Sequence, residues 1–188
     1  MPLFTPSRTK WRKWYTSIEL VHSDTVTSGL RSTQPTDGTT GAESTEAQSM
    51  LIPDAGTKII LVLPHDISPS VSVISYFTDR NLTNSGVSGN IAIWTVPRLV
   101  RVTTNSSTRT AADGTQIKTV FTANYGGSGN GRQYIVQQTV DFNTCSGFSA
   151  DGNDPLTLKL IEFQRRSADA TDTSTDSINC TGVYVYEN

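Results

Sequence analysis

The sequence of 188 residues predicts an all-β chain, folded as an antiparallel β sandwich with an extended N-terminal arm. Apolar and polar residues alternate with a period of two along most of the chain, and helical periodicity is almost absent. Thr and Val are frequent while Leu, Ala and Lys are few for this length, a composition that favours strands over helices. The length suits one domain with a substantial core, because two domains of this total size would each be small.

The first strand is expected from Trp14, where alternation places Trp14, Thr16, Ile18 and Leu20 on one face and Tyr15 on the other. Residues 1–13 are therefore interpreted as the arm, and residues 14–188 as the sandwich. Residues 23–49 are rich in Gly, Pro, Ser, Thr and acids and lack apolar periodicity. This composition predicts a long exposed loop.

The middle of the chain contains several strand patterns. In "TKIILVLP", an uninterrupted apolar run that ends at Pro64 indicates a central strand covered on both faces. Ile59, Leu61 and Leu63 would face one way, and Ile60 and Val62 the other. Further strands are predicted in "SVSVISYFT", "GNIAIWTVP", "RLVRVTT", "QIKTVFTAN" and "RQYIVQQTVDF", with Pro97 as a break between the second and third of these. In the last of them, Tyr134, Val136, Val140 and Phe142 share one face.

Two strand patterns close the chain. In "PLTLKLIEF" the inward residues are expected to be Leu156, Leu158 and Leu160, followed by a change of phase to Ile161 and Phe163. A β-bulge near Leu160 explains that change economically. The last strand places Val183 and Val185 on one face, with Cys180, Tyr184 and Tyr186 on the opposite one. Eight or nine such strands predict two packed sheets, and a jelly roll is the best match.

Composition excludes several classes of function. The net charge of −2 gives no general reason to expect a nucleic-acid partner. There is no signal peptide and no apolar run of the ~18 residues that a membrane span needs, so synthesis in a cytoplasm is expected, with no membrane partner. The sequons at Asn81, Asn105 and Asn179 would then carry no glycan. Cys145 and Cys180 are expected to be free, half-buried thiols, although a disulfide between them stays open.

No catalytic or metal-binding pattern stands out, so neither an enzyme nor a cofactor is expected. The only histidines, His22 and His65, lie at strand ends without a nucleophile beside them. Asp151, Asn153 and Asp154 could bind calcium through their oxygens, but a tight Asp-Gly turn before a strand is the plainer interpretation. The glycine-rich "YGGSGNGR" lacks the ending of a phosphate-binding loop and predicts a hairpin tip.

The basic N-terminus, "RTKWRKWY", is the candidate partner-binding segment. Its candidate residues are Arg8, Lys10, Trp11, Arg12 and Lys13. Arg and Trp are typical anchors of protein interfaces, which favours docking on another protein. Two alternatives stay open: Trp14 belongs to the core and the rest is a solvated flap, or the aromatics stack on nucleic-acid bases. Residues 1 to about 15 are expected to be disordered in the free protein and ordered on a partner.

A polar connector joins the last two strands in "EFQRRSADATDTSTDSINCTGVYVYE". Asp and Thr side chains bond to their own backbone, so a compact turn is expected. Arg165 or Arg166 could pair with Asp169, Asp172 or Asp176. If exposed, such a pair would contribute only ~0–1 kcal/mol.

The C-terminal pattern, an Arg-ended strand followed by "SADATDT" and "GVYVYE", resembles the signature of a group of jelly-roll structural proteins from tailed bacteriophages. Looser similarity extends back through "DGNDPLTLKLIEFQR", "GNIAIWTV", "KIILVLP" and "WYTSIEL". The polar residues 23–49 and the basic N-terminus depart from that pattern.

The resemblance implies a virion component without enzymatic activity, and the location that we expect for it is the capsid surface. The first interpretation is a capsid decoration (cement) protein that binds the major capsid protein outside a phage head, as a homo-oligomer that we expect to be a trimer. The alternative is a tail or fibre module that recognises a host surface glycan, with Tyr125 or Trp94 as the aromatic candidates. A coat protein that binds a genome through its arm is disfavoured, because four cations neutralise little phosphate.

Overall fold

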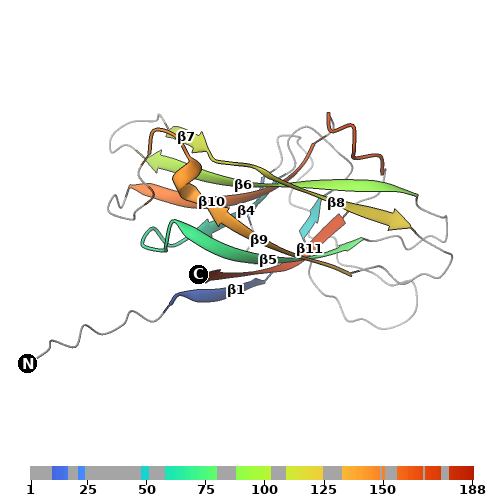
Figure 1. The fold of residues 1–188 in the computed structure, drawn as a ribbon, viewed down its shortest axis with the longest axis horizontal. Helices are drawn as coiled ribbons and strands as arrows, with labels where there is room; N and C mark the ends of the chain where they lie inside the picture. Colours follow the sequence, from blue (N-terminus) through green and yellow to red (C-terminus); the bar gives the residue numbers. More distant parts are fainter. Residues whose placement is uncertain are drawn as a thin grey trace, which may run out of the picture.

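The protein is a sandwich of two antiparallel sheets, seen edge-on in the computed structural model (Figure 1). The structure describes residues 10–16, 21–23, 48–50, 58–79, 88–102, 109–124, 133–148, 150, 156–166, 168–174 and 178–188. The strands are β1 (Arg12–Thr16), β2 (Val21–Ser23), β3 (Gln48–Met50), β4 (Lys58–Leu63), β5 (Ser70–Asp79), β6 (Ser88–Val102), β7 (Arg109–Asp113), β8 (Ile117–Asn124), β9 (Gln133–Asp141), β10 (Thr157–Arg165) and β11 (Ile178–Glu187). A short 3-10 helix, η2 (Phe142–Thr144), follows β9.

The first sheet, called sheet A, has the order β1-β11-β5-β9, with β3 also paired to β11. The second, called sheet B, has the order β2-β4-β10-β6-β7, with β8 also paired to β6. Every pair is antiparallel. The predicted all-β, antiparallel sandwich is therefore confirmed, and its architecture is that of a jelly-roll-like sandwich.

The core lies between the sheets and is joined across them by aromatic rings. Phe77 of β5 packs against Phe163 of β10 with centroids 5.8 Å apart, and against Phe121 of β8 at 5.7 Å. Each buried side chain of this size contributes roughly 1.5–3 kcal/mol of burial free energy. The inward faces of β9 and β11 match the prediction, since Val140, Phe142, Val183 and Val185 are all buried.

Strand β10 corrects the predicted change of phase near Leu160. Its register with both β4 and β6 is continuous, so there is no bulge at that point. The inward residues alternate regularly and include Thr157 and Lys159, whereas Leu158 is 37% exposed. Lys159 can face the core because its Nζ donates to the carbonyl oxygens of His65 at 2.9 Å and Ile67 at 2.5 Å. The sequence pattern therefore assigned the wrong residues to the core face of β10, because the charged Lys159 lies on that face.

Pro97 does not separate two strands, as the sequence predicted, but lies within the single strand β6. On one edge β6 pairs with β8 up to Thr95 and with β7 from Arg98, so Pro97 lies between the two partners. A missing N–H costs no ladder hydrogen bond at such a position. The Pro97 carbonyl is used, accepting from the Gly114 N–H at 2.8 Å.

Two further expectations about strand faces are wrong. Strand β4 is not covered on both faces, because Val62 is 45% exposed, although Ile59, Leu61 and Leu63 are buried as expected. Cys180 is fully buried rather than facing outward with Tyr184, because the register with β5 shifts between Cys180 and Gly182. A one-residue shift moves a side chain to the opposite face of the sheet.

The N-terminal segment is ordered further toward its start than expected. Arg12 and Lys13, assigned to the arm from the sequence, lie in β1, which pairs with β11 from Arg12 to Thr16. The expectation of disorder to about residue 15 is therefore wrong for this stretch, because its backbone completes the sheet. Of the predicted long loop, Ser23 belongs to β2, and Gln48 and Ser49 belong to β3.

We predict that Lys159→Met lowers the free energy of unfolding by about 1–3 kcal/mol, because the carbonyls of His65 and Ile67 lose their buried donor. The matched control is Lys10→Met, since Lys10 is exposed. Urea denaturation followed by tryptophan fluorescence measures both. Equal stability of Lys159→Met and the wild type would show that the buried ammonium is dispensable.

Candidate partner-binding surfaces

The connector after β10 is fastened by a buried ion pair. Arg165 donates from Nε and Nη2 to the two carboxylate oxygens of Asp172, each at 2.7 Å, and from Nη2 to the Ser174 carbonyl at 2.6 Å. Both charged side chains are 0% exposed. The sequence suggested an Arg–Asp pair here, and because the pair is buried, the small contribution of an exposed pair does not apply. Removing one partner of a buried pair typically costs about 3–5 kcal/mol.

The same connector is joined to the start of β6 through backbone groups. The N–H groups of Thr173 and Ser174 donate to the Asn90 carbonyl at 2.8 and 3.0 Å, and Asp172 Oδ2 accepts from the Ala92 N–H at 3.1 Å. The approach is close, since a Cβ on Gly89 would lie 3.1 Å from the Ser174 backbone. Gly89 also has φ +145°, which a side chain rarely tolerates.

Asp169 is the acceptor at the centre of the turn. Its Oδ1 accepts from Lys118 Nζ at 2.7 Å and from the N–H and hydroxyl of Thr171, and its Oδ2 accepts from Trp94 Nε1 at 2.7 Å. Burial alone would raise the pKa of Asp169, but these donors outweigh it and hold the pKa well below its ordinary value. Asp169 is therefore ionised at neutral pH.

A depression of about 350 Å³ opens beside this turn, and we call it the Trp94 depression. It is lined by Trp94, Lys118, Arg166, Ala168, Asp169 and Ala170. Both cations contact the indole, with Lys118 Nζ 5.3 Å and Arg166 Cζ 4.5 Å from the ring centroid. They come from either side of β6. Lys118 lies on β8, in register with Trp94 of β6, and Arg166 follows β10, which pairs with β6 along its other edge.

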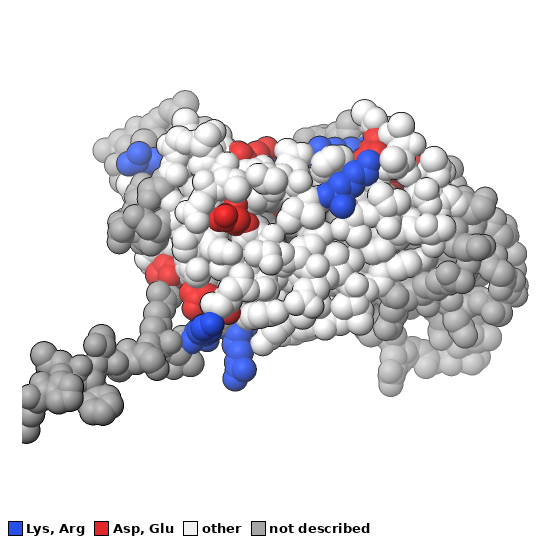
Figure 2. All heavy atoms as spheres, viewed as in Figure 1, with Lys and Arg blue, Asp and Glu red and all other residues white. Residues whose placement is uncertain are grey.

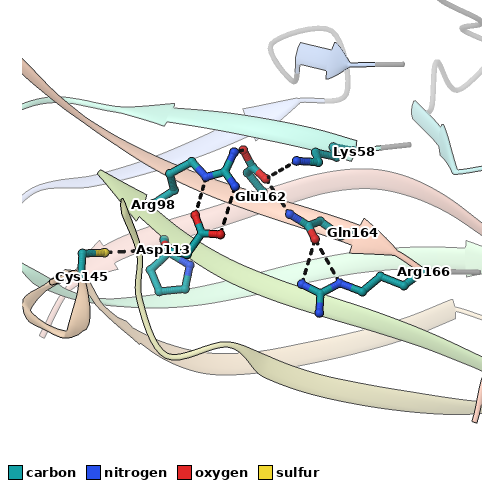
Figure 3. A network of polar contacts seen from close by, with 8 residues as sticks. Lys58, Arg98, Asp113, Cys145, Glu162, Gln164 and Arg166 are labelled. Carbon is teal, nitrogen blue, oxygen red and sulfur yellow. Dashed lines mark hydrogen bonds and ion pairs between the residues drawn. The ribbon is translucent and has the colours of Figure 1, made fainter. Parts of the chain in front are cut away.

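Arg166 also ends a polar network on the outer face of sheet B (Figure 3). Its Nε and Nη2 donate to Gln164 Oε1, and Gln164 Nε2 donates to Glu162 Oε2 at 2.6 Å. Glu162 is only 2% exposed and is neutralised by Lys58 at 3.2 Å and Arg98 at 2.7 Å. The network fixes the position of the Arg166 guanidinium.

The far end of the network is an ion pair between β6 and β7. Arg98 donates in a fork to both oxygens of Asp113, and this hydrogen bonding lowers the pKa of Asp113 and raises that of Arg98. These residues face outward on separate strands, so they become neighbours only through the register Arg98↔Asp113. Single-strand alternation marks them as polar but does not reveal the partnership.

The N-terminal candidates gather along the edge of sheet A. Lys10, Arg12 and Lys13 are exposed, and Trp11 is half-buried against the core. Glu187 holds Trp11 in place, because its Oε2 accepts from the Trp11 N–H at 2.7 Å and its Oε1 accepts from the Ser68 N–H at 2.8 Å. Arg8 lies outside the described residues.

A second depression, of about 430 Å³, lies beside Trp11, and we call it the Trp11 depression. It is lined by Lys10, Trp11, Arg12, Tyr184, Tyr186 and Glu187. Near it on sheet A, Trp14 lies opposite Tyr184 in the register of β1 with β11, is 44% exposed and meets Tyr76 edge-on at 5.0 Å. The missing side chain of Gly182 leaves room for the Trp14 ring, since a Cβ there would lie 2.5 Å from it. Trp14 is thus a surface residue, not the core residue of the flap alternative.

The remaining candidates form no reactive centre in the part of the chain that the structure describes. His65 is exposed, and the side chain of His22 in β2 is outside the described set, as are Asp151, Asn153, Asp154, Asp176 and Tyr125. The described residues contain no group of three His, Cys, Asp or Glu that could hold a metal ion. Within the same residues, no helix has the length and apolar character to cross a membrane.

Cys145 and Cys180 are both free thiols, as the sequence favoured, but they are fully rather than half-buried. Burial raises the pKa of Cys145 to about 11 and that of Cys180 to about 12. The reactive species of a cysteine is its thiolate, which is scarce at neutral pH when the pKa is this high. Neither thiol is therefore an activated nucleophile.

Comparison with known proteins finds similarity to solved structures but no match by sequence. No family model matches the chain, and no curated protein matches it. A chain in a structure of infectious bursal disease virus, Gt strain, aligns over 95% of this protein with 17% identity and a TM-score of 0.30. This protein spans 33% of that viral chain. None of these comparisons points to tailed-phage proteins, so that resemblance stays a prediction.

We predict that Asp169→Asn lowers the free energy of unfolding at pH 7 by roughly 1.5–3 kcal/mol, the range for hydrogen bonds to charged groups. The lowered pKa means that the carboxylate stabilises the fold fully above the unfolded value of about 3.9. That contribution is lost progressively as the pH falls below it. Denaturation at pH 7 and pH 3 should therefore give a smaller difference in acid. A difference independent of pH would contradict the assignment.

Proposed function

We propose that this protein is a non-enzymatic virion structural protein, a decoration protein that binds the outside of a phage head through the Trp11 depression. Its partner in this proposal is the major capsid protein, and the bound form is a homotrimer. The observation that carries the proposal is the pairing of half-buried aromatic rings with exposed cations at the edge of sheet A. The resemblance of the C-terminal pattern to phage jelly-roll proteins supports it.

The chemistry of the Trp11 depression suits a protein partner. Trp, Tyr and Arg supply most of the binding energy at protein interfaces, and here they share one depression. Figure 2 shows cationic side chains projecting at the β1 end of one face, next to a broad area without charge. Because Glu187 already holds the Trp11 backbone, little chain entropy remains to be lost on binding.

Self-association is proposed from the edges of sheet A. The order β1-β11-β5-β9 leaves β1 and β9 with one partner each among the described strands. Unpaired strand edges promote association unless they are covered or charged. A symmetric trimer would present three Trp11 depressions to the capsid lattice, and multivalency would strengthen a modest contact made by each subunit.

Glycan recognition by a tail or fibre module is the alternative function, and the outer face of sheet A is the observation that favours it. Trp14, Tyr76, Tyr184 and Tyr186 present aromatic rings there, and Gln137 Nε2 donates to the Tyr186 hydroxyl at 3.2 Å. Rings beside amides and hydroxyls suit neutral sugars. Binding to a glycan array that is lost with Trp14→Ala, together with no binding to heads, would promote this function over the first.

We predict that Trp11→Ala weakens binding to heads stripped of this protein at least tenfold, because the depression loses its central aromatic side chain. Lys10→Ala should weaken binding only at low salt, where an exposed charge is poorly screened. Co-sedimentation with heads of the parent phage at 20 and 200 mM NaCl measures both effects. Binding of Trp11→Ala equal to wild type would place docking elsewhere on the sandwich.

A stability control accompanies that experiment, because Trp11 packs against the core. Arg12→Ala serves as the folding-neutral variant, since the Arg12 side chain is exposed in β1 while its backbone keeps the pairing with β11. Circular dichroism at the binding temperature should show all three variants folded. If the wild-type protein ignores heads altogether, the decoration function is wrong.

A further inference from the structure

We infer that the Trp94 depression is a second binding site, which takes a carboxylate of an acidic peptide segment on a partner protein through the Arg166 guanidinium. The site lies on sheet B, whereas the Trp11 depression lies on sheet A, so the two are distinct surfaces. If the proposed function holds, the acidic segment belongs to the capsid. The chemistry of the site does not depend on that function.

Arg166 forms no ion pair with a carboxylate of the described residues. Its hydrogen bonds there go to Gln164 Oε1, a neutral amide oxygen, from Nε at 3.1 Å and from Nη2 at 2.9 Å. The other cation of the depression, Lys118, is already paired with Asp169 at 2.7 Å. Among the described residues, the depression therefore carries one positive charge in excess, and none of them accepts a hydrogen bond from Nη1.

The guanidinium is held in position before any ligand arrives. The Trp94 ring contacts it at 4.5 Å, and Gln164 is itself fixed by its hydrogen bond to the buried Glu162. Figure 3 shows Arg166 reaching back over Gln164 at the end of this network. A positioned planar fork loses little side-chain entropy on binding and matches the geometry of a carboxylate.

The depression offers donors and almost no side-chain acceptors. Both Asp169 oxygens are occupied by donors from Lys118, Thr171 and Trp94. A carboxylate only accepts hydrogen bonds, so it fits such a site. A sugar would bring several hydroxyl donors without partners, and its ring would compete with two cations for the indole. The site therefore favours an Asp or Glu side chain over a saccharide, even an acidic one.

Access to the guanidinium is open from the connector. Ala168 and Ala170, which border the depression, are exposed and small, so they leave room for the backbone of an extended peptide. The connector that carries them is fastened by the Arg165–Asp172 pair. The connector that borders the site is thus held at Asp172 and Ser174.

The test is an NMR titration of the full chain with Ac-Gly-Glu-Glu-Gly-NH₂, read at the Arg166 Nε–H and Trp94 Nε1–H signals. We expect saturable shifts at both signals at low salt. We expect at least tenfold weaker binding to Arg166→Gln, and a smaller loss with Arg166→Lys, which keeps the charge but not the fork. The matched control, Arg101→Gln, removes an equal charge from the opposite end of β6, outside both depressions, and should bind as the wild type does.

Three results would overturn the inference. The first is no shift at either signal with the peptide, and the second is equal binding by Arg166→Gln and wild type. The third is saturation by methyl glucuronoside at lower concentration than by the peptide, which would make the ligand a saccharide. Because heads are absent from this titration, its outcome is independent of whether the decoration function holds.

Discussion

The buried ion pair of Arg165 and Asp172 attaches the connector after β10 to sheet B, and the Trp94 depression on that sheet depends on this attachment. Arg165 ends β10 and Asp172 lies in the connector, so the pair joins a central strand to the segment that leaves it. Asp172 also accepts from the backbone of β6. Two full charges without exposure are tolerated because both carboxylate oxygens and the guanidinium are satisfied by hydrogen bonds. Because the connector is attached in this way, Asp169 lies where it can accept the hydrogen bond from Trp94 Nε1.

The two depressions have different physical characters, and they are supported differently. The Trp11 depression is aromatic and lies on an edge strand, where a single carboxylate, Glu187, joins the chain's first described residues to its last strand. The Trp94 depression is cationic and rests on a network that crosses sheet B from Asp113 to Arg166. Sites on opposite sheets would let one protein contact two parts of an assembly, which raises the effective concentration of each contact.

The alternation of apolar and polar residues predicted much of the fold, because most strands here have one solvent-exposed face and one buried face. The strand in residues 133–141 and the alternation of Val183 and Val185 were read correctly on that basis. The failures occur where a polar or cyclic residue is compensated by a distant partner. Lys159 faces the core because two carbonyls of another segment accept hydrogen bonds from it, and Pro97 stays in a strand because β6 changes partners there.

The candidate surfaces were predictable only in part. Trp and Arg near the N-terminus are visible in the sequence, but the clamp by Glu187 joins residues separated by 176 positions. Trp94, Lys118 and Arg166 lie on three separate elements, and sheet register alone brings them together. The acids of the connector were noted as candidates, yet burial decided which of them pairs with Arg165. Burial is a property of the packed chain, which no local pattern reports.

Amide hydrogen exchange of the connector tests the central claim, the fastening of this segment by the buried pair, most directly. The N–H groups of Thr173 and Ser174 donate to Asn90 only while the connector is attached. The account predicts that in the wild type both exchange at least about 10³-fold more slowly than in an unstructured peptide, as the interior of β6 does. In Asp172→Asn their protection should fall while that of β6 persists. Unprotected amides at these two positions in the wild-type protein would contradict the account.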